Sequence, residues 1–387
     1  MDLKRIQEAL NRNKLDGWLF FDHHVRDELA YRVLGVTPAG HVSRRWYYFI
    51  PAAGEPRGLV HRIESRILDA APGEKIQYSS WREQQEGLAS LLRRARRVAM
   101  QYSPRCAIPY VAMVDAGTVE LVRESGVEVV SSAELIQEFE ACLTETQREM
   151  HFEAGKRVDR IRAEAFRLIG DRIDSGVDEV AVRDWILAEF AKTGLVTDSG
   201  PIVGVNAHAG DPHYEPSAET SRPIRRGDFV LLDMWAKLDR PGAVFYDITW
   251  TGNCGPASDR IQRVFEIVRD ARDRAIDTVV QAVAAGREIR GFEVDDAARG
   301  HIQAAGYGER FVHRTGHSIG ESVHGSGANM DNLETHDERR IVPGALFSIE
   351  PGIYLYDFGV RSEVNVFVSK DGAAVTGEIQ RELVQIA

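Results

Sequence analysis

The sequence predicts an α/β protein of two domains, and three observations lead to that fold class. The chain has 387 residues, which is long for a single hydrophobic core. Helical and strand patterns alternate through the first third of the chain. A capped helix start then follows directly after Leu143. We therefore expect an α/β domain over residues 1–143 and a second domain over residues 144–387.

The first domain is predicted from short apolar runs that alternate with amphipathic helices. Helices are expected at 3–15, within 81–100 and at the start of 114–132. Strands are expected at 16–21, 44–56, 57–63 and the end of 114–132. No glycine-rich phosphate loop occurs among these segments, so a nucleotide-binding fold is not supported.

The second domain begins with a helix that carries its own start signal. Thr144 is suited to cap it, and an acidic residue in the first turn favours that end. Further helices are expected at 178–194 and 257–283, with strands at 200–206, 228–238 and 243–251. The order of helices followed by strands occurs twice, which indicates a duplicated half.

The composition excludes several partners and locations. A net charge of -11 argues against nucleic acid or an anionic membrane as partner. No stretch approaches the roughly 18 apolar residues of a membrane span, and the N-terminus lacks a signal-peptide core. The three cysteines, at positions 106, 142 and 254, have no metal-like spacing and are odd in number. A reducing, cytoplasmic environment is therefore expected.

The stretch "HRTGHSIGESVHG" at 313–325 places His313, His317 and His324 among three glycines. Taken alone, each of these histidines is better explained as a structural or surface residue than as a ligand. Clustered imidazoles in a segment too rich in glycine for a stable helix also fit a metal or catalytic site. The surrounding strands decide between these two interpretations.

Two expected hairpins carry an acid on each arm. In "FVLLDMWAKLDRPGAVFYDITWTG", a turn centred on Arg240 sets Asp233 opposite Asp247. In "FSIEPGIYLYDFGVRSEVNVFV", a turn at 356–357 sets Glu350 opposite Glu363.

The apolar flanks of these acids indicate burial, and unpaired buried carboxylates are costly. Singly, each acid has a structural explanation: a turn, a strand end or a salt bridge of Glu363 with Arg361. Together, four acids and a histidine favour divalent cations as the missing positive charge.

Four segments together resemble a known family. They are "DMWAKLDRPGAVFYDITWTG", "HRTGHSIGESVH", "SIEPGIY" and "GVRSEVNVFV". Their order and spacing resemble those of the pita-bread metallopeptidases, which include Xaa-Pro aminopeptidases and prolidases and are related to methionine aminopeptidases and creatinase. The resemblance covers nearly the whole chain. It implies a C-terminal pita-bread fold with pseudo-duplicated halves, preceded by a smaller creatinase-like N-terminal α/β domain.

The resemblance implies five metal ligands. Asp247 and Glu363 would bridge two divalent ions, Asp233 would bind one of them, and His317 and Glu350 the other. Mn²⁺ is expected first, with Co²⁺, Fe²⁺ or Zn²⁺ as alternatives. A hydroxide held between the two ions would attack the carbonyl that precedes proline.

The resemblance also implies catalytic residues on the substrate side of the metals. His213, His313 and His324 match histidines near the substrate, and Arg361 matches an arginine that supports the site. The implied substrate is a peptide with proline at the second position, from which the first residue is released. A homodimer is implied as well.

The sequence departs from the family pattern at two informative places. Trp235 stands where many relatives have glycine, next to a lengthened turn. His336 stands where prolidases have an arginine for the prolyl carboxylate, and Arg339 and Arg340 lie out of register with that arginine. The second departure favours an Xaa-Pro aminopeptidase over an Xaa-Pro dipeptidase.

Three alternatives stay open at this point. One is an Xaa-Pro dipeptidase, or prolidase. Another is a metal-dependent hydrolase or lyase of the same fold that acts on a small non-peptide carboxylate. The third is a catalytically silent binding module, against which the complete ligand set argues.

Overall fold

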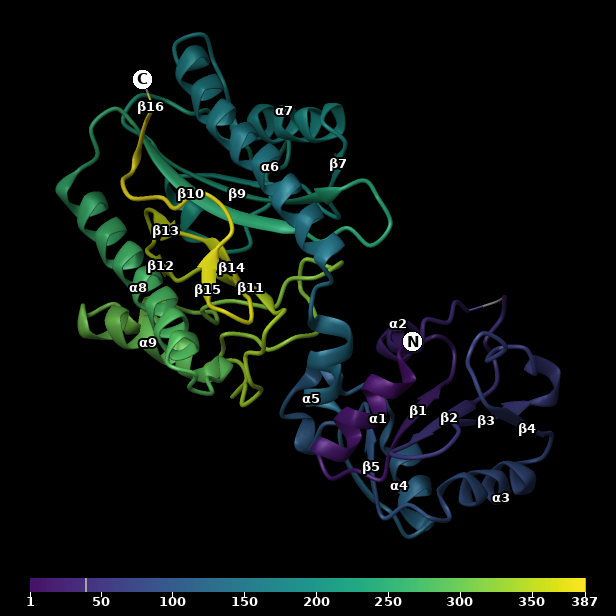
Figure 1. The fold of residues 1–387 in the computed structure, drawn as a ribbon. Coiled ribbons are helices and arrows are strands. Elements are labelled where there is room, and N and C mark those ends of the chain that lie inside the picture. The colour runs from purple at the N-terminus through teal and green to yellow at the C-terminus, as the bar shows by residue number, and fades with distance from the viewer. Residues whose placement is uncertain (39, 387) are drawn as a thin grey trace. The chain divides into compact units, whose positions relative to one another are not determined.

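The computed structural model describes residues 1–38 and 40–386. The chain divides into two compact units, Met1–Glu140 and Ala141–Ala387 (Figure 1). Within the described ranges, none of the helices combines the length and the apolar character needed to cross a membrane.

The first unit is built from five α-helices and six strands among its described residues. The helices are α1 Leu3–Arg12, α2 Glu28–Leu34, α3 Trp81–Leu92, α4 Ala116–Glu124 and α5 Ala133–Ile136. The strands are β1 Gly17–Asp22, β2 Trp46–Pro51, β3 Arg57–His61, β4 Glu74–Tyr78, β5 Arg97–Met100 and β6 Glu128–Ser131. They form one mixed sheet in the order β4-β3-β2-β1-β5-β6.

Both faces of this sheet are covered by helices, because side chains alternate between its faces. Trp18 and Phe20 of β1 pack into a core with α1 and α2. Leu19 and Phe21 of the same strand pack into a second core with α3 and α4. A strand buried on both sides explains why β1 is apolar at almost every position.

The second unit has four α-helices and ten strands among its described residues. The helices are α6 Glu145–Arg172, α7 Glu179–Lys192, α8 Asp259–Ala284 and α9 Gly291–Ala304. The longer strands are β8 Ile202–Val205, β9 Phe229–Leu238, β10 Tyr246–Cys254, β11 Leu346–Ile349 and β14 Val364–Val368. The shorter strands are β7 Leu195–Val196, β12 Gly352–Tyr354, β13 Gly359–Arg361, β15 Ala373–Val375 and β16 Val384–Ile386.

The start of α6 confirms the expected helix cap. The Thr144 side chain accepts a hydrogen bond from the backbone N–H of Gln147, and the Gln147 side chain accepts one from the backbone of Thr144. This reciprocal capping box satisfies donors that the first helical turn leaves unpaired.

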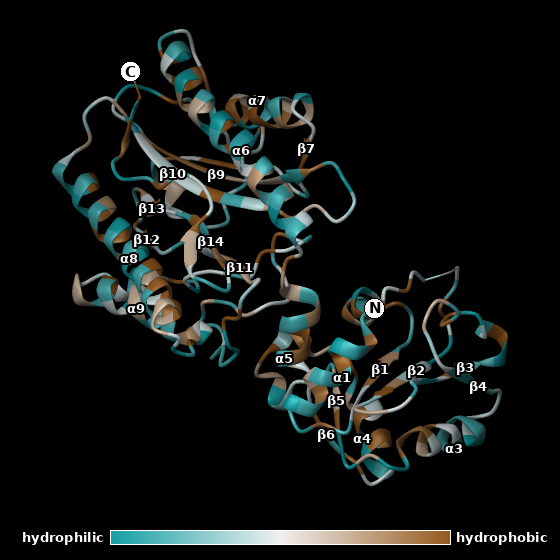
Figure 2. Cartoon of the chain, in the orientation of Figure 1, coloured by the Kyte–Doolittle hydropathy of each residue, from teal (hydrophilic) through white to brown (hydrophobic). Residues whose placement is uncertain are grey.

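Helices lie on both sides of the strands of the second unit. Figure 1 shows α6 and α7 on one side of β9 and β10, and α8 and α9 on the other. The helices alternate hydrophilic and hydrophobic residues along their length, as Figure 2 shows for α8. Val230, Leu232 and Met234 of β9 pack in the core under α6 and α7. The alternate residues of β9 therefore face the other way, and Asp233 is one of them.

Candidate metal centre

The hairpin of β9 and β10 holds two of the predicted acids on one face. Asp247 pairs with Trp235, and Asp233 pairs with Thr249. The predicted register, with Asp233 directly opposite Asp247, was wrong by two residues. Because a strand repeats every two residues, this shift leaves both acids on the same face.

The turn explains the difference in register. Ala243 donates its backbone N–H to the carbonyl of Arg240, so Pro241 and Gly242 are the two central turn residues. Gly242 has a φ of 75°, which the second central position of such a turn requires and which favours glycine. The turn is therefore centred beyond Arg240, and the strands slide accordingly.

The second hairpin has the predicted register. Ile349 pairs with Val364, which sets the next residues, Glu350 and Glu363, opposite each other. The chain reverses at 356–357 as expected, closed by a hydrogen bond between the flanking residues. The backbone N–H of Glu363 bonds to β10 rather than to its hairpin partner, which brings this acid beside Asp247.

His317 reaches the centre from the glycine-rich segment that runs along β11. Its backbone N–H donates to Ser348 Oγ at 2.9 Å, and its carbonyl accepts from the Ser348 N–H at 2.8 Å. A Cβ on the preceding Gly316 would lie 2.0 Å from the Ser348 carbonyl oxygen. Only glycine permits this approach, so the segment needs its glycine to place the imidazole.

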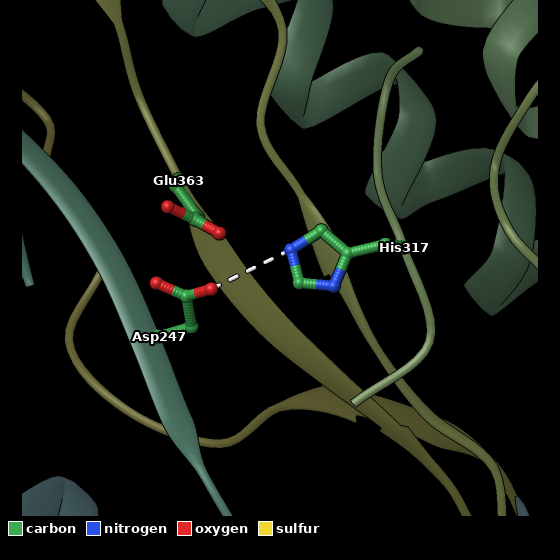
Figure 3. Close-up of side chains that lie close together, drawn as sticks. All are labelled: Asp247, His317 and Glu363. Carbon is green, nitrogen blue, oxygen red and sulfur yellow. Dashed lines mark ion pairs between the residues drawn. The ribbon is translucent and has the colours of Figure 1, made fainter. Parts of the chain in front are cut away.

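The acids and the imidazole converge on a common point (Figure 3). Ligand atoms of Asp247, His317 and Glu363 all lie within 4.8 Å of one another. His317 Nε2 lies 3.5 Å from a carboxylate oxygen of Asp247 and 3.3 Å from one of Glu350. Three different segments of the chain therefore contribute donors of the types that bind transition metals.

Several carboxylate oxygens of this group have no hydrogen-bond partner among the described residues. Asp233 Oδ1, Asp247 Oδ1 and Glu363 Oε1 are buried and accept no hydrogen bond from the described residues. Buried carboxylate oxygens without partners are strongly destabilising. The arrangement fits one or more cations, which would satisfy all three oxygens.

The electrostatic surroundings lead to the same conclusion. Burial raises the pKa of Asp247 and of Glu363 well above the ordinary range, and the neighbouring carboxylates raise both further. Burial also raises the pKa of Asp233, although the charge of Arg361 opposes this effect. A divalent cation would keep all three as carboxylates near neutral pH.

Arg361 makes its ion pair with Asp233 and not with Glu363. Its guanidinium contacts the Asp233 carboxylate directly. It also donates to Thr249 Oγ1 at 3.1 Å and to the Tyr354 hydroxyl at 2.9 Å. Thr249 Oγ1 in turn donates to the second oxygen of Glu363 at 2.8 Å. These hydrogen bonds orient Asp233 and Glu363 and leave one oxygen of each carboxylate available to bind a cation.

The three other predicted histidines line the same cavity. His313 lies 2.7 Å from the Tyr354 hydroxyl through Nε2 and is half-buried. The ring of His324 meets that of His317 edge to face, with 4.4 Å between their centroids. His213 is exposed at the cavity wall.

The cavity has a volume of about 840 Å³ and contains all five predicted ligands and Arg361 in its wall. His336 is outside it: this half-exposed side chain bonds to Asn332 and lies against the ring of Phe292. Arg339 is also elsewhere, in a buried bidentate pair with Asp337. Neither of these two side chains lines the cavity.

Two groups at the cavity wall were not predicted as site residues. Arg314, next to His313, lines the cavity 4.0 Å from Glu334. Asp198, from the loop after β7, accepts a hydrogen bond of 2.7 Å from the indole N–H of Trp235. Arg314 was discoverable from its place inside the histidine stretch, whereas nothing in the sequence points to Asp198.

A family model, metallopeptidase family M24, matches residues 152–370, which contain all five predicted ligands. The chain belongs to this family. M24 membership makes the protein a metallopeptidase, and it implies divalent metal ions and a peptide substrate.

Relatives within M24 carry peptidase names. The putative dipeptidase YkvY of Bacillus subtilis is 31% identical over 264 residues, which are 67% of this chain and 66% of that protein. The probable dipeptidase PepE of Mycobacterium bovis is 29% identical over 342 residues, 87% of this chain and 84% of PepE. The Xaa-Pro dipeptidase of Lactobacillus helveticus is 33% identical over 211 residues, 54% of this chain and 53% of that enzyme.

Solved structures confirm the fold along the whole chain. Dipeptidase PepE from Mycobacterium ulcerans has a TM-score of 0.74 at 24% identity, covering 99% of this chain and 96% of that one. A prolidase from Thermococcus sibiricus has a TM-score of 0.64 at 23% identity, covering 99% and 98%. The predicted pita-bread α/β fold is therefore confirmed.

Proposed function

We propose that this M24 peptidase hydrolyses the bond before proline in Xaa-Pro dipeptides and requires two divalent cations. The observation that carries this proposal is the group of four carboxylates and one imidazole facing one cavity, with three buried oxygens unpartnered. The relatives named dipeptidase and Xaa-Pro dipeptidase support it.

The residues that would hold the cations are Asp233, Asp247, His317, Glu350 and Glu363. Asp247 and Glu363 would be the bridging ligands, because their ligand atoms lie within 4.8 Å of each other and of His317, and each has a buried oxygen without a partner among the described residues. Four carboxylates balance the charge of two divalent ions. We propose Mn²⁺ as the metal, since mixed carboxylate and imidazole ligands suit it, with Co²⁺, Fe²⁺ or Zn²⁺ as substitutes.

When bound, the cations supply an activated water and polarise the scissile carbonyl. The chain's own groups orient the ligands and the substrate. Arg361 holds Asp233 in place, and His313 is held by Tyr354 at the cavity wall. His324 stays neutral near pH 7, because the neighbouring His317 lowers its pKa to about 4. A neutral imidazole can donate to the oxygen of the scissile carbonyl and steady its developing charge.

Arg314 favours a dipeptide over a longer peptide. It lines the cavity beside Glu334, and a guanidinium at a cavity wall recognises a free carboxylate through two parallel hydrogen bonds. His336, which stands where prolidases have an arginine for the prolyl carboxylate, does not line the cavity. An Xaa-Pro aminopeptidase is the second candidate, favoured by the cavity volume of about 840 Å³, which is large for a dipeptide.

We propose a homodimeric, cytoplasmic enzyme, in keeping with the acidic composition and the three cysteines without metal-like spacing. We also propose that the first unit corresponds to the smaller creatinase-like domain and the second to the catalytic domain.

The test is hydrolysis of Ala-Pro, Ala-Pro amide, Ala-Pro-Ala and Ala-Ala-Ala by metal-stripped protein, with and without Mn²⁺. We expect Mn²⁺-dependent cleavage of Ala-Pro, slower cleavage of the amide, and none of Ala-Ala-Ala. Arg314→Leu should raise KM for Ala-Pro much more than for its amide. Preferred cleavage of Ala-Pro-Ala would establish the aminopeptidase instead, and cleavage of Ala-Ala-Ala would contradict proline specificity.

A further inference from the structure

The wall beside the metal ligands contains an aromatic residue fixed to an acid. Trp235 lies two residues from Asp233 on β9 and pairs with Asp247 on β10, so it shares their face. Its indole N–H donates to Asp198 Oδ1 at 2.7 Å. Both side chains line the cavity. The hydrogen bond therefore holds a carboxylate at the edge of an aromatic ring, beside the reacting centre.

Asp198 brings a carboxylate to the cavity wall. Within the described ranges, it forms no ion pair with a lysine or arginine. The two arginines of the cavity wall are engaged elsewhere: Arg361 with Asp233, and Arg314 with Glu334. The remaining acids of the wall outside the ligand set are Asp211, Glu215 and Glu334. Outside the ligand set the cavity wall therefore carries four acids and two paired arginines, and this balance favours a cation.

Apolar groups complete the surroundings of this pair. Ile202 and Val323 line the cavity, and Trp235 packs against the same hydrophobic clusters as these two residues. A partly buried indole offers a broad surface to methylene groups and a negative face to a cation. An aliphatic side chain that ends in a positive group matches an apolar surface that lies next to a carboxylate.

We propose that Trp235 and Asp198 form a subsite for the side chain of a substrate whose first residue is lysine or arginine. The inference rests on the proposed function, because it takes an Xaa-Pro dipeptide as the substrate. Proline has no charged side chain. In an Xaa-Pro dipeptide, a side-chain cation can belong only to the first residue. The methylene groups would lie along Trp235, Ile202 and Val323, and the head group would meet Asp198.

The test compares Lys-Pro with norleucyl-Pro, which has a side chain of similar length without the charge, and with Ala-Pro. In Mn²⁺-loaded wild type we expect kcat/KM for Lys-Pro to exceed that for norleucyl-Pro about tenfold, or about 1.4 kcal/mol. Asp198→Asn should reduce this ratio to near one, because its amide oxygen still accepts from Trp235 but carries no charge. Trp235→Phe should reduce the ratio in part.

Asp239→Asn is the matched control, since Asp239 is an exposed acid at the end of β9 that does not line the cavity. It should leave the ratio unchanged. A wild-type ratio near one would overturn the inference while leaving the proposed function intact. An equal loss for all three peptides in Asp198→Asn would also overturn it, because Asp198 would then act on the α-ammonium group common to all three.

Binding separates the two proposals if no peptide is cut. The affinities of free lysine and norleucine for the Mn²⁺-loaded protein are then measured by calorimetry. Tighter binding of lysine that Asp198→Asn removes would support the subsite although the proposed function fails. Equal binding of the two amino acids would overturn the subsite as well.

Discussion

Replacing Glu363 by glutamine should stabilise the metal-free protein and destabilise the metal-loaded one. Glu363 Oε2 accepts from Thr249 Oγ1 at 2.8 Å, and the carbonyl oxygen of glutamine can keep this bond. Glu363 Oε1 is the orphaned oxygen. The glutamine NH₂ at that place can donate to Asp247 instead of repelling it.

The size of the gain follows from the distance between the charges. Ligand oxygens of Asp247 and Glu363 lie within 4.8 Å. At an effective dielectric constant of about 20, two unit charges at that separation repel by about 3.5 kcal/mol. Because burial raises the pKa of Glu363, protonation already relieves part of this repulsion at pH 7. The expected gain in unfolding free energy is therefore about 1–3 kcal/mol.

The same shift predicts a dependence on pH with a definite sign. In the metal-free protein the pKa of Glu363 is raised above its ordinary value of 4.5. Above pH 4.5 the folded state therefore keeps a proton that the unfolded chain has released. Stability is therefore lost as the pH rises from about 4.5 through the folded pKa. Glu363→Gln should flatten this loss.

The assay is denaturant unfolding in EDTA and in Mn²⁺, from pH 5 to pH 8. With Mn²⁺ the variant should be less stable than wild type, because weaker metal binding stabilises the folded state less. Glu382→Gln, at an exposed glutamate outside the cavity wall, is the control and should change neither condition. Equal destabilisation of Glu363→Gln in EDTA and in Mn²⁺ would refute the reasoning.

Three further predictions follow from the site and its surroundings. Asp247→Ala should abolish activity and release metal, because both ions lose a bridging ligand; two retained equivalents by elemental analysis would contradict this role. His324→Ala should lower kcat and leave the metal content unchanged, whereas loss of metal would mean that His317 and His324 have exchanged roles. Burial lowers the pKa of His151 to about 4 from 6.5, so the folded state binds fewer protons between these values. Stability should therefore fall by about 3 kcal/mol as the pH drops from 6.5 to 4, and less so in His151→Gln, when unfolding free energies of the two proteins are compared.

The sequence alone predicted the principal helices and strands and the side chains that the structure gathers around the cavity. The Thr144 cap is a local signal, and it marks the start of α6 because capping depends only on residues within one turn. The alternation of apolar residues along β9 placed Asp233 on the face away from α6, since strand side chains repeat every two residues. The order and spacing of the acids and histidines indicated the family, because both can be read from the sequence without knowledge of the fold.

The tertiary structure alone decided which groups meet. The register of the first hairpin depended on a turn centred at Pro241 and Gly242. The local sequence does not distinguish this turn from one centred on Arg240. The ion pair of Arg361 joins Asp233 across 128 residues, and the bond of Trp235 joins Asp198 across 37. Such contacts arise from packing of whole sheets and loops, which local propensity does not encode. The same packing placed Arg314 in the cavity wall and His336 outside it, which no local pattern in the sequence indicates.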